Sequence, residues 1–179
     1  MDRQTEIRKD RNGNKVVVIH NIAFKGKRNI QWHNVETYLK RYVGKCYTVA
    51  DIKEKIYIGA DFPDEYANSN YSYYLKGTNA KAKANAVQAL PELIQIAANR
   101  QYEENYKAKH KKDAQNGWYR YESRFALPVF GENNQIVRYQ VFYALMLVRH
   151  AKNNKMYLYD MMRIKKEMGN LFQSNDLTQ

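Results

Sequence analysis

Apolar residues follow different periods along this chain, and the period predicts which segments form helices and which form strands. Residues 15–24 (KVVVIHNIAF) are almost continuously β-branched or apolar, which predicts a buried strand. In residues 31–43 apolar positions recur at helical spacing and Gly44 follows, which predicts a helix of about three turns ending at this glycine. Residues 46–49 and 55–58 each have the length and composition of a short strand.

The middle of the chain predicts further helical structure. Residues 66–78 are rich in Asn, Ser, Tyr and Gly, which is typical of a loop. Residues 80–100 are alanine-rich and carry an apolar stripe, which predicts a helix. Pro91 predicts a kink or the start of a new helix, because proline has no backbone N–H to donate. Residues 102–116 continue as a helical but strongly basic segment.

The C-terminal third changes to strand-like runs. These are residues 118–129 (WYRYESRFALPV), 136–150 (IVRYQVFYALMLVRH) and 156–164 (MYLYDMMRI). The segments between them, 131–134 and 152–154, are short and rich in Asn, as hairpin turns are. Three runs joined by two hairpin turns predict a three-stranded antiparallel meander. Its middle strand is apolar on both faces, so we expect it at the centre of the sheet, covered by helices on at least one side.

These elements together predict one α+β domain. It spans residues 15–167, with helices packed on an antiparallel sheet that ends in the three-stranded meander. Residues 1–14 are polar and charged and predict a flexible N-terminus, and residues 168–179 predict a polar C-terminal tail. A chain of 179 residues is long enough to bury a continuous core without disulfides or metals.

A strongly basic composition indicates the kind of partner. Lys and Arg number 30 against 18 Asp and Glu, so the formal net charge is +12 and the pI is about 9.6. Such a charge destabilises the compact state by self-repulsion and therefore favours a function with a polyanionic partner. We expect nucleic acid, RNA or DNA, ahead of an anionic membrane surface.

Several other classes of protein are disfavoured by what the sequence lacks. Cys46 is the single cysteine, so an internal disulfide and a cysteine-based zinc site are excluded. The four histidines form no helical zinc motif, and no glycine-rich loop has the spacing of a nucleotide-hydrolysing P-loop. The sequence has neither a secretory signal nor an apolar run of membrane-spanning length. We therefore expect a cytoplasmic protein that uses no metal and no cofactor and does not associate with membranes.

Cationic and aromatic residues are most concentrated in residues 100–124. Cations neutralise phosphates, and aromatic faces stack on unpaired bases. A second group of lysines surrounds residues 77–79, at the expected start of a helix, where free N–H groups suit a phosphate. The alternative is a solvated helix face followed by a tyrosine-rich core strand. The residues expected to bind nucleic acid are Lys76, Lys81, Lys83, Arg100, Lys107, Lys109, Lys111, Lys112, Trp118, Tyr119, Tyr121 and Arg149.

Residues of the types used by metal-independent ribonucleases are also present. Such an enzyme needs a general base, a general acid and a cation that stabilises the charge on the phosphorane. His110 or His150, each beside other cations, would carry protons, and Arg120 or Arg124 would hold the phosphate. Strand alternation places Arg120 and Arg124 on the same face. The alternative is a binding surface with incidental titratable groups, and the sequence does not decide between them.

Carboxylates provide further candidates. Glu122 lies on the same strand face as the two arginines and is a candidate base, and Tyr159 is a candidate acid. A metal-dependent nuclease is less supported, because it needs two or three converging carboxylates. A stretch of acidic groups lies instead in residues 51–65, where they would face a basic partner or mimic phosphate.

Five stretches within residues 56–167 carry a family resemblance: IYIGADFPDEYANS, LKGTNAKAKANAVQALPELI, GWYRYESRFALPV, YALMLVRHA and MYLYD. Their layout, an alanine-rich helix with an LPEL turn followed by a strand meander, resembles nuclease-like domains of bacterial mobile elements, in the barnase, EndoU, colicin and RelE-like group. The resemblance implies a helix packed on an antiparallel sheet, RNA as the substrate and catalysis without metal. It also implies catalytic residues along the sheet face, where the matching positions are His110, Arg120, Ser123, Arg124 and His150.

The same resemblance leaves a second hypothesis open, because many such domains have kept binding without catalysis. Small proteins of mobile elements and phages also include inhibitors of host defence, among them type II anti-CRISPR proteins. A non-catalytic inhibitor would hold DNA or RNA on the basic surface, while its acidic stretch docks on a CRISPR effector nuclease. A transcriptional or packaging factor is a weaker third hypothesis, because no helix-turn-helix spacing stands out.

Overall fold

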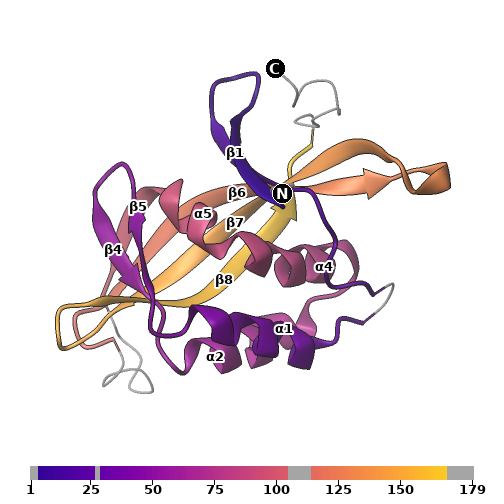
Figure 1. The fold of residues 1–179 in the computed structure, drawn as a ribbon. Helices are drawn as coiled ribbons and strands as arrows, with labels where there is room; N and C mark the ends of the chain where they lie inside the picture. Colours follow the sequence, from indigo (N-terminus) through magenta and orange to yellow (C-terminus); the bar gives the residue numbers. More distant parts are fainter. Residues whose placement is uncertain (1–3, 27–28, 105–113, 169–179) are drawn as a thin grey trace.

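Short helices cover one face of a twisted, mostly antiparallel sheet in this mixed α+β protein (Figure 1). The computed structural model describes residues 4–26, 29–104 and 114–168. The strands are β1 (Thr5–Lys9), β2 (Lys15–Ile19), β3 (Cys46–Val49), β4 (Glu54–Tyr57), β5 (Ala98–Glu103), β6 (Trp118–Phe130), β7 (Ile136–His150) and β8 (Met156–Lys166). The helices are α1 (Trp32–Leu39), α2 (Phe62–Asn68), α3 (Asn70–Tyr74), α4 (Gly77–Ala86) and α5 (Leu90–Gln95), with 3-10 turns η1 (Lys40–Tyr42), η2 (Val87–Ala89) and η4 (Glu132–Asn134).

The three long strands β6, β7 and β8 pair antiparallel in chain order, as the meander predicted from the sequence requires. β7 lies between the other two, in agreement with its apolar residues on both faces. β8 carries extra residues relative to β7: Leu147 pairs with Asp160 while the next residue, Val148, pairs with Leu158. This bulge leaves Asp160 and Met161, which are consecutive, both buried.

The remaining strands join this meander through pairings between distant parts of the chain. β5 pairs antiparallel with the first half of β6, and β2 pairs parallel with β6 at Phe125 and Ala126. On the other side β4 pairs parallel with β8, and β3 completes that edge. The sheet is therefore not purely antiparallel. Parallel neighbours need long crossover connections, which local sequence patterns do not reveal.

Two segments expected to be irregular are ordered. Residues 5–9, assigned from their polarity to a flexible N-terminus, form β1, which pairs with β2 and packs Ile7 against the core. Residues 66–78, expected as a loop, contain the end of α2, the whole of α3 and the start of α4. The side chain of Ser69 accepts a hydrogen bond from the N–H of Ser72 and so caps α3.

The alanine-rich segment is divided at Pro91, as expected. Pro91 lies in the first turn of α5, where its missing N–H removes no helical hydrogen bond. The helical prediction is wrong for residues 98–103, which form β5 along the free edge of β6, and residues 105–113 of the predicted basic helix lie outside the described residues. Arg100 and Tyr102 therefore lie on a strand. None of the described helices has the length and apolar character needed to cross a bilayer.

The main core lies between the helices and one face of the sheet. That face is lined by buried side chains of alternating strand residues, and Phe125 stacks on Phe142 with ring centroids 5.4 Å apart. A smaller cluster on the opposite face contains Val16, Val18 and Val141. The face with the larger core is called the helix-covered face below.

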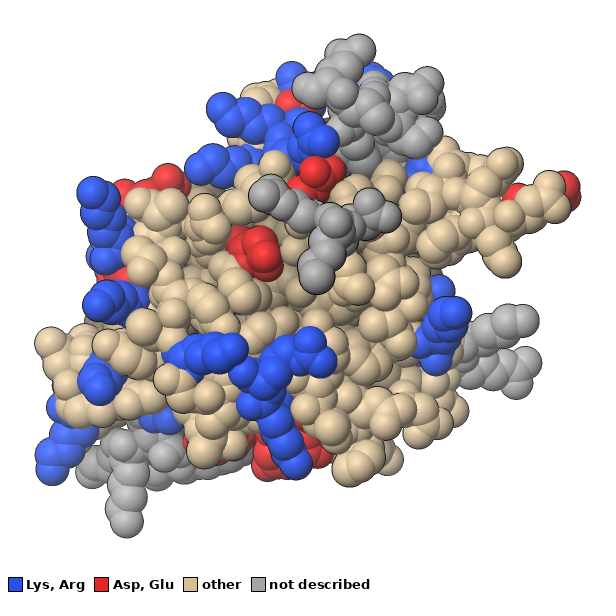
Figure 2. Space-filling model, viewed as in Figure 1, with Lys and Arg blue, Asp and Glu red and all other residues tan. Residues whose placement is uncertain are grey.

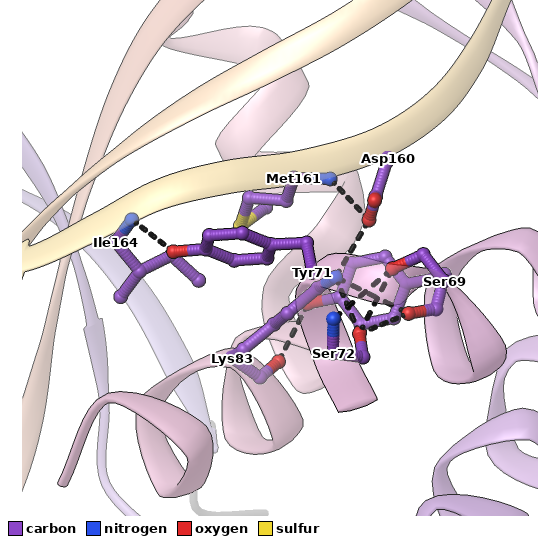
Figure 3. A network of polar contacts seen from close by, with 8 residues as sticks. Ser69, Tyr71, Ser72, Lys83, Asp160, Met161 and Ile164 are labelled. Carbon is purple, nitrogen blue, oxygen red and sulfur yellow. Dashed lines mark hydrogen bonds and ion pairs between the residues drawn. The ribbon is translucent and has the colours of Figure 1, made fainter. Parts of the chain in front are cut away.

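A buried ion pair fixes α4 to β8 (Figure 3). The Nζ of Lys83 donates to Asp160 Oδ1 and Ser72 Oγ, both at 2.6 Å, and to the carbonyl of Tyr66 at 3.2 Å. The side chains of Lys83 and Asp160 are 0% and 2% exposed. Burial lowers the pKa of Lys83 and raises the pKa of Asp160. All three ammonium donors of Lys83 are used inside the protein, so the expected contact of Lys83 with nucleic acid is wrong.

A candidate nucleic-acid site around His150

Two adjoining grooves meet at the end of the sheet where the turn between β7 and β8 lies beside β4. They share three lining residues, Tyr119, His150 and Asn154, so they are treated as one site, the His150 groove. Its lining residues are Glu54, Lys55, Tyr57, Tyr102, Glu104, Gln115, Asn116, Gly117, Tyr119, His150, Asn154, Lys155 and Met156.

His150, the last residue of β7, is held in a defined position. Its backbone N–H donates to the carbonyl of Gly117 at 2.9 Å, and its own carbonyl accepts from the N–H of Asn116 at 3.0 Å. The imidazole Nε2 lies 2.7 Å from Oδ1 of Asn154, and the ring centroid lies 5.8 Å from that of Tyr119. These contacts use Nε2 and the ring of His150 and do not involve Nδ1.

An aromatic pair forms one wall of the groove. The rings of Tyr102 and Tyr119 lie 5.1 Å apart, and Tyr102 is 54% exposed. Gly117 makes this arrangement possible, since its φ is +97° and a Cβ there would lie 2.7 Å from the Tyr102 ring. Tyr102 also donates a hydrogen bond to the carbonyl of Asn116 at 3.2 Å. Exposed tyrosine faces of this kind stack on unpaired bases.

Cations surround the same groove. Arg100 Nη1 lies 2.5 Å from Glu54 Oε2, and its guanidinium lies over the Tyr119 ring at 5.1 Å. The other oxygen of Glu54 accepts a hydrogen bond from the hydroxyl of Tyr121, whose pKa is raised by burial and by this carboxylate. Lys155 lies 4.9 Å from the centre of the Tyr57 ring. Arg100 remains 41% exposed and is therefore available to an anion.

The expected convergence of Arg120, Arg124 and His150 on one site is wrong. Arg120 pairs with Leu147, which is three residues from His150, so alternation puts the two arginines and His150 on opposite faces of the sheet. Arg124 also uses its donors internally, on both oxygens of Glu167 at 2.6 and 2.8 Å. Arg120 is paired with Glu103 at 2.7 Å.

Other expected site residues are buried. Ser123 is 3% exposed and donates to the carbonyl of Leu93 at 2.9 Å, and Tyr121 is fully buried. Trp118 is 8% exposed. The expected catalytic role of Ser123 and the expected base stacking by Tyr121 are therefore wrong, because both side chains belong to the helix-covered face and pack in its core.

The other residues expected to bind nucleic acid lie in different parts of the molecule. Tyr119 lines the His150 groove and Arg100 lies over the ring of Tyr119, whereas Lys76 and Lys81 lie just before and within α4, in another part of the molecule. The guanidinium of Arg149 lies over the Tyr157 ring at 4.4 Å. Five expected residues fall outside the described part of the chain: Lys107, Lys109, His110, Lys111 and Lys112.

Sequence patterns missed Glu54, Lys55, Tyr57, Asn154 and Lys155 as site residues. β4 and the β7–β8 turn come together only through the parallel pairing of β4 with β8, which has no local signature. The one available signal was the position of Asn154 in a hairpin turn four residues after His150. Within the described residues, no three His, Cys, Asp or Glu side chains gather as metal ligands would.

The charge of the whole molecule is not confined to this groove. Figure 2 shows Lys and Arg at several separate places on the face in view, including the edge where the β3–β4 hairpin lies. The basic surface is therefore divided among several regions.

Comparisons with known proteins give no relative of this chain: no protein-family model, no curated protein and no solved structure matches it. The resemblance to nuclease-like domains thus rests on the sequence layout alone.

Proposed function

We propose that this chain binds nucleic acid and cleaves RNA at the His150 groove without a metal ion. The observation that carries the proposal is the position of His150, in a groove that is lined by tyrosine rings and by Lys155, with Arg100 over the ring of Tyr119. Imidazole is the side chain most often used for proton transfer near neutral pH. The basic net charge of the chain supports a polyanionic substrate.

Each group in the groove has a role in this proposal. Arg100 and Lys155 neutralise the phosphate and the charge that develops on it. Tyr102 and Tyr119 hold an unpaired base by stacking. In RNA the 2′-hydroxyl attacks the adjacent phosphorus: a base takes its proton, the P–O bond to the 5′-oxygen breaks, and an acid protonates that oxygen. His150 and the carboxyls of Glu54 and Glu104 line the groove and are able to exchange these protons.

Replacement of His150 tests the catalytic part of the proposal. We expect H150A to lower the rate of RNA cleavage in EDTA by about 100-fold or more, since a positioned acid or base contributes roughly that factor. The measurement is cleavage of a labelled single-stranded RNA from about pH 5 to 8, with DNA of the same sequence for comparison.

The matched control is H33A, which removes an exposed histidine from α1, on an element that does not line the groove. H33A is expected to cleave like the unmodified chain. Absence of cleavage by the unmodified chain, with RNA binding intact, rules out the enzymatic proposal. Equal rates for H150A and the unmodified chain rule out the role of His150.

A specific observation favours the non-catalytic alternative. Both oxygens of Glu54 are engaged, by Arg100 and Tyr121, so this carboxylate is not a free base beside His150 in this conformation. A DNA- or RNA-binding inhibitor of a defence nuclease, such as a type II anti-CRISPR protein, needs only the cationic and aromatic groups. It predicts that the protein co-purifies with a CRISPR effector and protects target DNA, and unchanged effector cleavage at large molar excess contradicts it.

A further inference from the structure

A second groove lies at the opposite end of β6 and β7 from the His150 groove. There the tip of the β6–β7 hairpin, residues 127–138, extends away from the rest of the sheet, beyond α4 (Figure 1). This segment is called the arm. Two adjoining cavities of about 370 and 460 Å³ lie between the arm, α4 and the loop after β2, and both are lined by Ile22, Lys81 and Phe130. They are treated together as the arm groove.

The arm groove has an apolar floor and a cationic rim. Ile22 and Leu127 are buried beneath it, and Phe130 is 44% exposed on the arm. The cations that line it are Lys25, Lys81, Arg138 and Lys166. No Asp or Glu is among its lining residues, all of which belong to the described part of the chain. Protein surfaces usually mix acidic and basic residues. A rim with cations and no carboxylates therefore favours an anionic ligand.

One guanidinium nitrogen of Arg138 has no hydrogen-bond partner among the described residues. Its Nη1 is buried, and no described group accepts a hydrogen bond from it. Arg138 pairs with Val129 on the neighbouring strand, and both line the groove together with Leu127. A buried donor without a partner is costly, and a phosphate oxygen is the acceptor that best fits the planar guanidinium.

The wall of the groove is fixed before any ligand binds. Asn85 of α4 is fully buried, and its Oδ1 accepts from the N–H groups of Ala23 at 2.9 Å and Phe24 at 3.0 Å. Gln88 donates to the carbonyl of Asn21 at 3.0 Å. These bonds hold the loop after β2 against the helices, so the groove is preformed, which reduces the entropy lost on binding.

We infer that the arm groove is a second binding site, which takes a nucleotide, either free or as one unit of a nucleic-acid strand. Arg138 and Lys81 bind the phosphate, and the base packs on Phe130 and the apolar floor. The cavity volumes lie within the range of pockets that hold small ligands. The inference rests on the nucleic-acid partner of the proposed function, but it does not depend on cleavage.

The first test removes the two phosphate-binding cations. UMP and inorganic phosphate are titrated by calorimetry at low salt into an H150A/K155Q background, so that the arm groove is examined apart from the His150 groove. Adding K81Q and R138Q is expected to weaken UMP binding about tenfold or more, because each removes a charge-assisted contact. The matched control adds K40Q and K45Q, two exposed lysines outside the arm groove.

The second test separates the base from the phosphate. F130A replaces a partly exposed residue and is expected to fold normally, which its thermal unfolding midpoint checks. It is expected to weaken UMP binding while leaving phosphate binding unchanged, because only the base packs on the ring. Comparing UMP with an oligouridylate of about ten nucleotides distinguishes a free nucleotide from a strand, since only a strand gains further contacts.

The outcomes that overturn this inference differ from those that overturn cleavage. UMP binding that is unaffected by K81Q and R138Q, or equally weakened by K40Q and K45Q, contradicts the site. Binding of polyglutamate in place of UMP assigns the groove to an acidic protein segment and also contradicts it. Loss of cleavage in H150A with arm-groove binding intact leaves the inference standing, and intact cleavage with no UMP binding here removes only the inference.

Discussion

At the scale of single residues, the buried pair of Lys83 and Asp160 illustrates how environment decides what a charged side chain does. Lys83 lies in a run of sequence with two other lysines, Lys76 and Lys81, yet it alone points inward. Its ammonium group offsets the desolvation cost with three hydrogen bonds and the charge of Asp160. Removal of only one of the two charges is therefore expected to cost folding free energy.

We expect K83M to lower the free energy of unfolding by about 3–5 kcal/mol, because it leaves the buried Asp160 carboxyl without its counter-charge. Burial already raises the folded pKa of Asp160. Without Lys83 the folded state holds a proton that the unfolded state has lost, so the variant should lose stability as pH rises above about 4. Urea unfolding across pH checks both effects.

The double variant K83M/D160L is the control for this prediction. It replaces both charges with apolar groups, and its stability is expected to return close to that of the unmodified chain. A double variant as unstable as K83M would show that the lost stability comes from packing and not from the unpaired charge.

At the scale of elements, β1 and the turn that follows it depend on two carboxylates. Glu6 Oε1 forms an ion pair with Arg8 Nε at 3.0 Å and lies 3.2 Å from His20 Nε2. Asp10 accepts from the N–H groups of Asn12 and Asn14, each at 2.9 Å. Burial alone would raise the pKa of both carboxyls, but these partners and the nearby cations lower it. The ionised forms therefore hold the N-terminal strand in place.

We expect the stability of this protein to fall as pH drops below the ordinary carboxyl values of 4.5 for Glu6 and 3.8 for Asp10. A carboxyl whose pKa is lower in the folded state than in the unfolded state stabilises the fold at pH values above its unfolded pKa. This stabilisation is lost as the pH falls through its folded pKa. The thermal unfolding midpoint, measured from about pH 6 to 3, should fall less steeply in E6Q. The control is E132Q, at the exposed tip of the arm, which should keep the original slope.

At the scale of the whole molecule, the charge of +12 is divided among separate surfaces. Two of these surfaces are grooves, and each has its own cations to bind a phosphate. They lie near opposite ends of β6 and β7. A long strand that reaches both would bind more tightly than a short one, since the second contact is intramolecular. Affinity should therefore depend on both salt and strand length.

We expect the logarithm of the RNA binding constant to fall linearly with the logarithm of salt concentration, by about 0.7 for each phosphate contacted on a single strand. K155Q removes one cation from the His150 groove and should reduce this slope by about that amount. K9Q, at an exposed position of β1, should leave the slope unchanged. A slope that does not change in K155Q contradicts the contact between Lys155 and phosphate.

Local sequence patterns found those parts of the fold that local forces specify. Alternating and continuous apolar runs predicted β6, β7 and β8, because burial on a pleated surface selects for them. Pro91 predicted the start of α5 for a stereochemical reason. β1 and β5 were missed, since their polar residues carry no period and they become strands only by pairing with neighbours distant in sequence.

By itself, the sequence determined the long meander, the division at Pro91 and the excess of positive charge, because each depends on neighbouring residues or on composition. Only the tertiary structure decided which charges meet. It turned Lys83 into the core, put Arg120 and Arg124 on the face opposite to His150, and brought Glu54 and Lys155 beside that histidine. The physical reason is that a site depends on the face each strand residue occupies and on pairings across the chain, and neither is recorded in a local pattern.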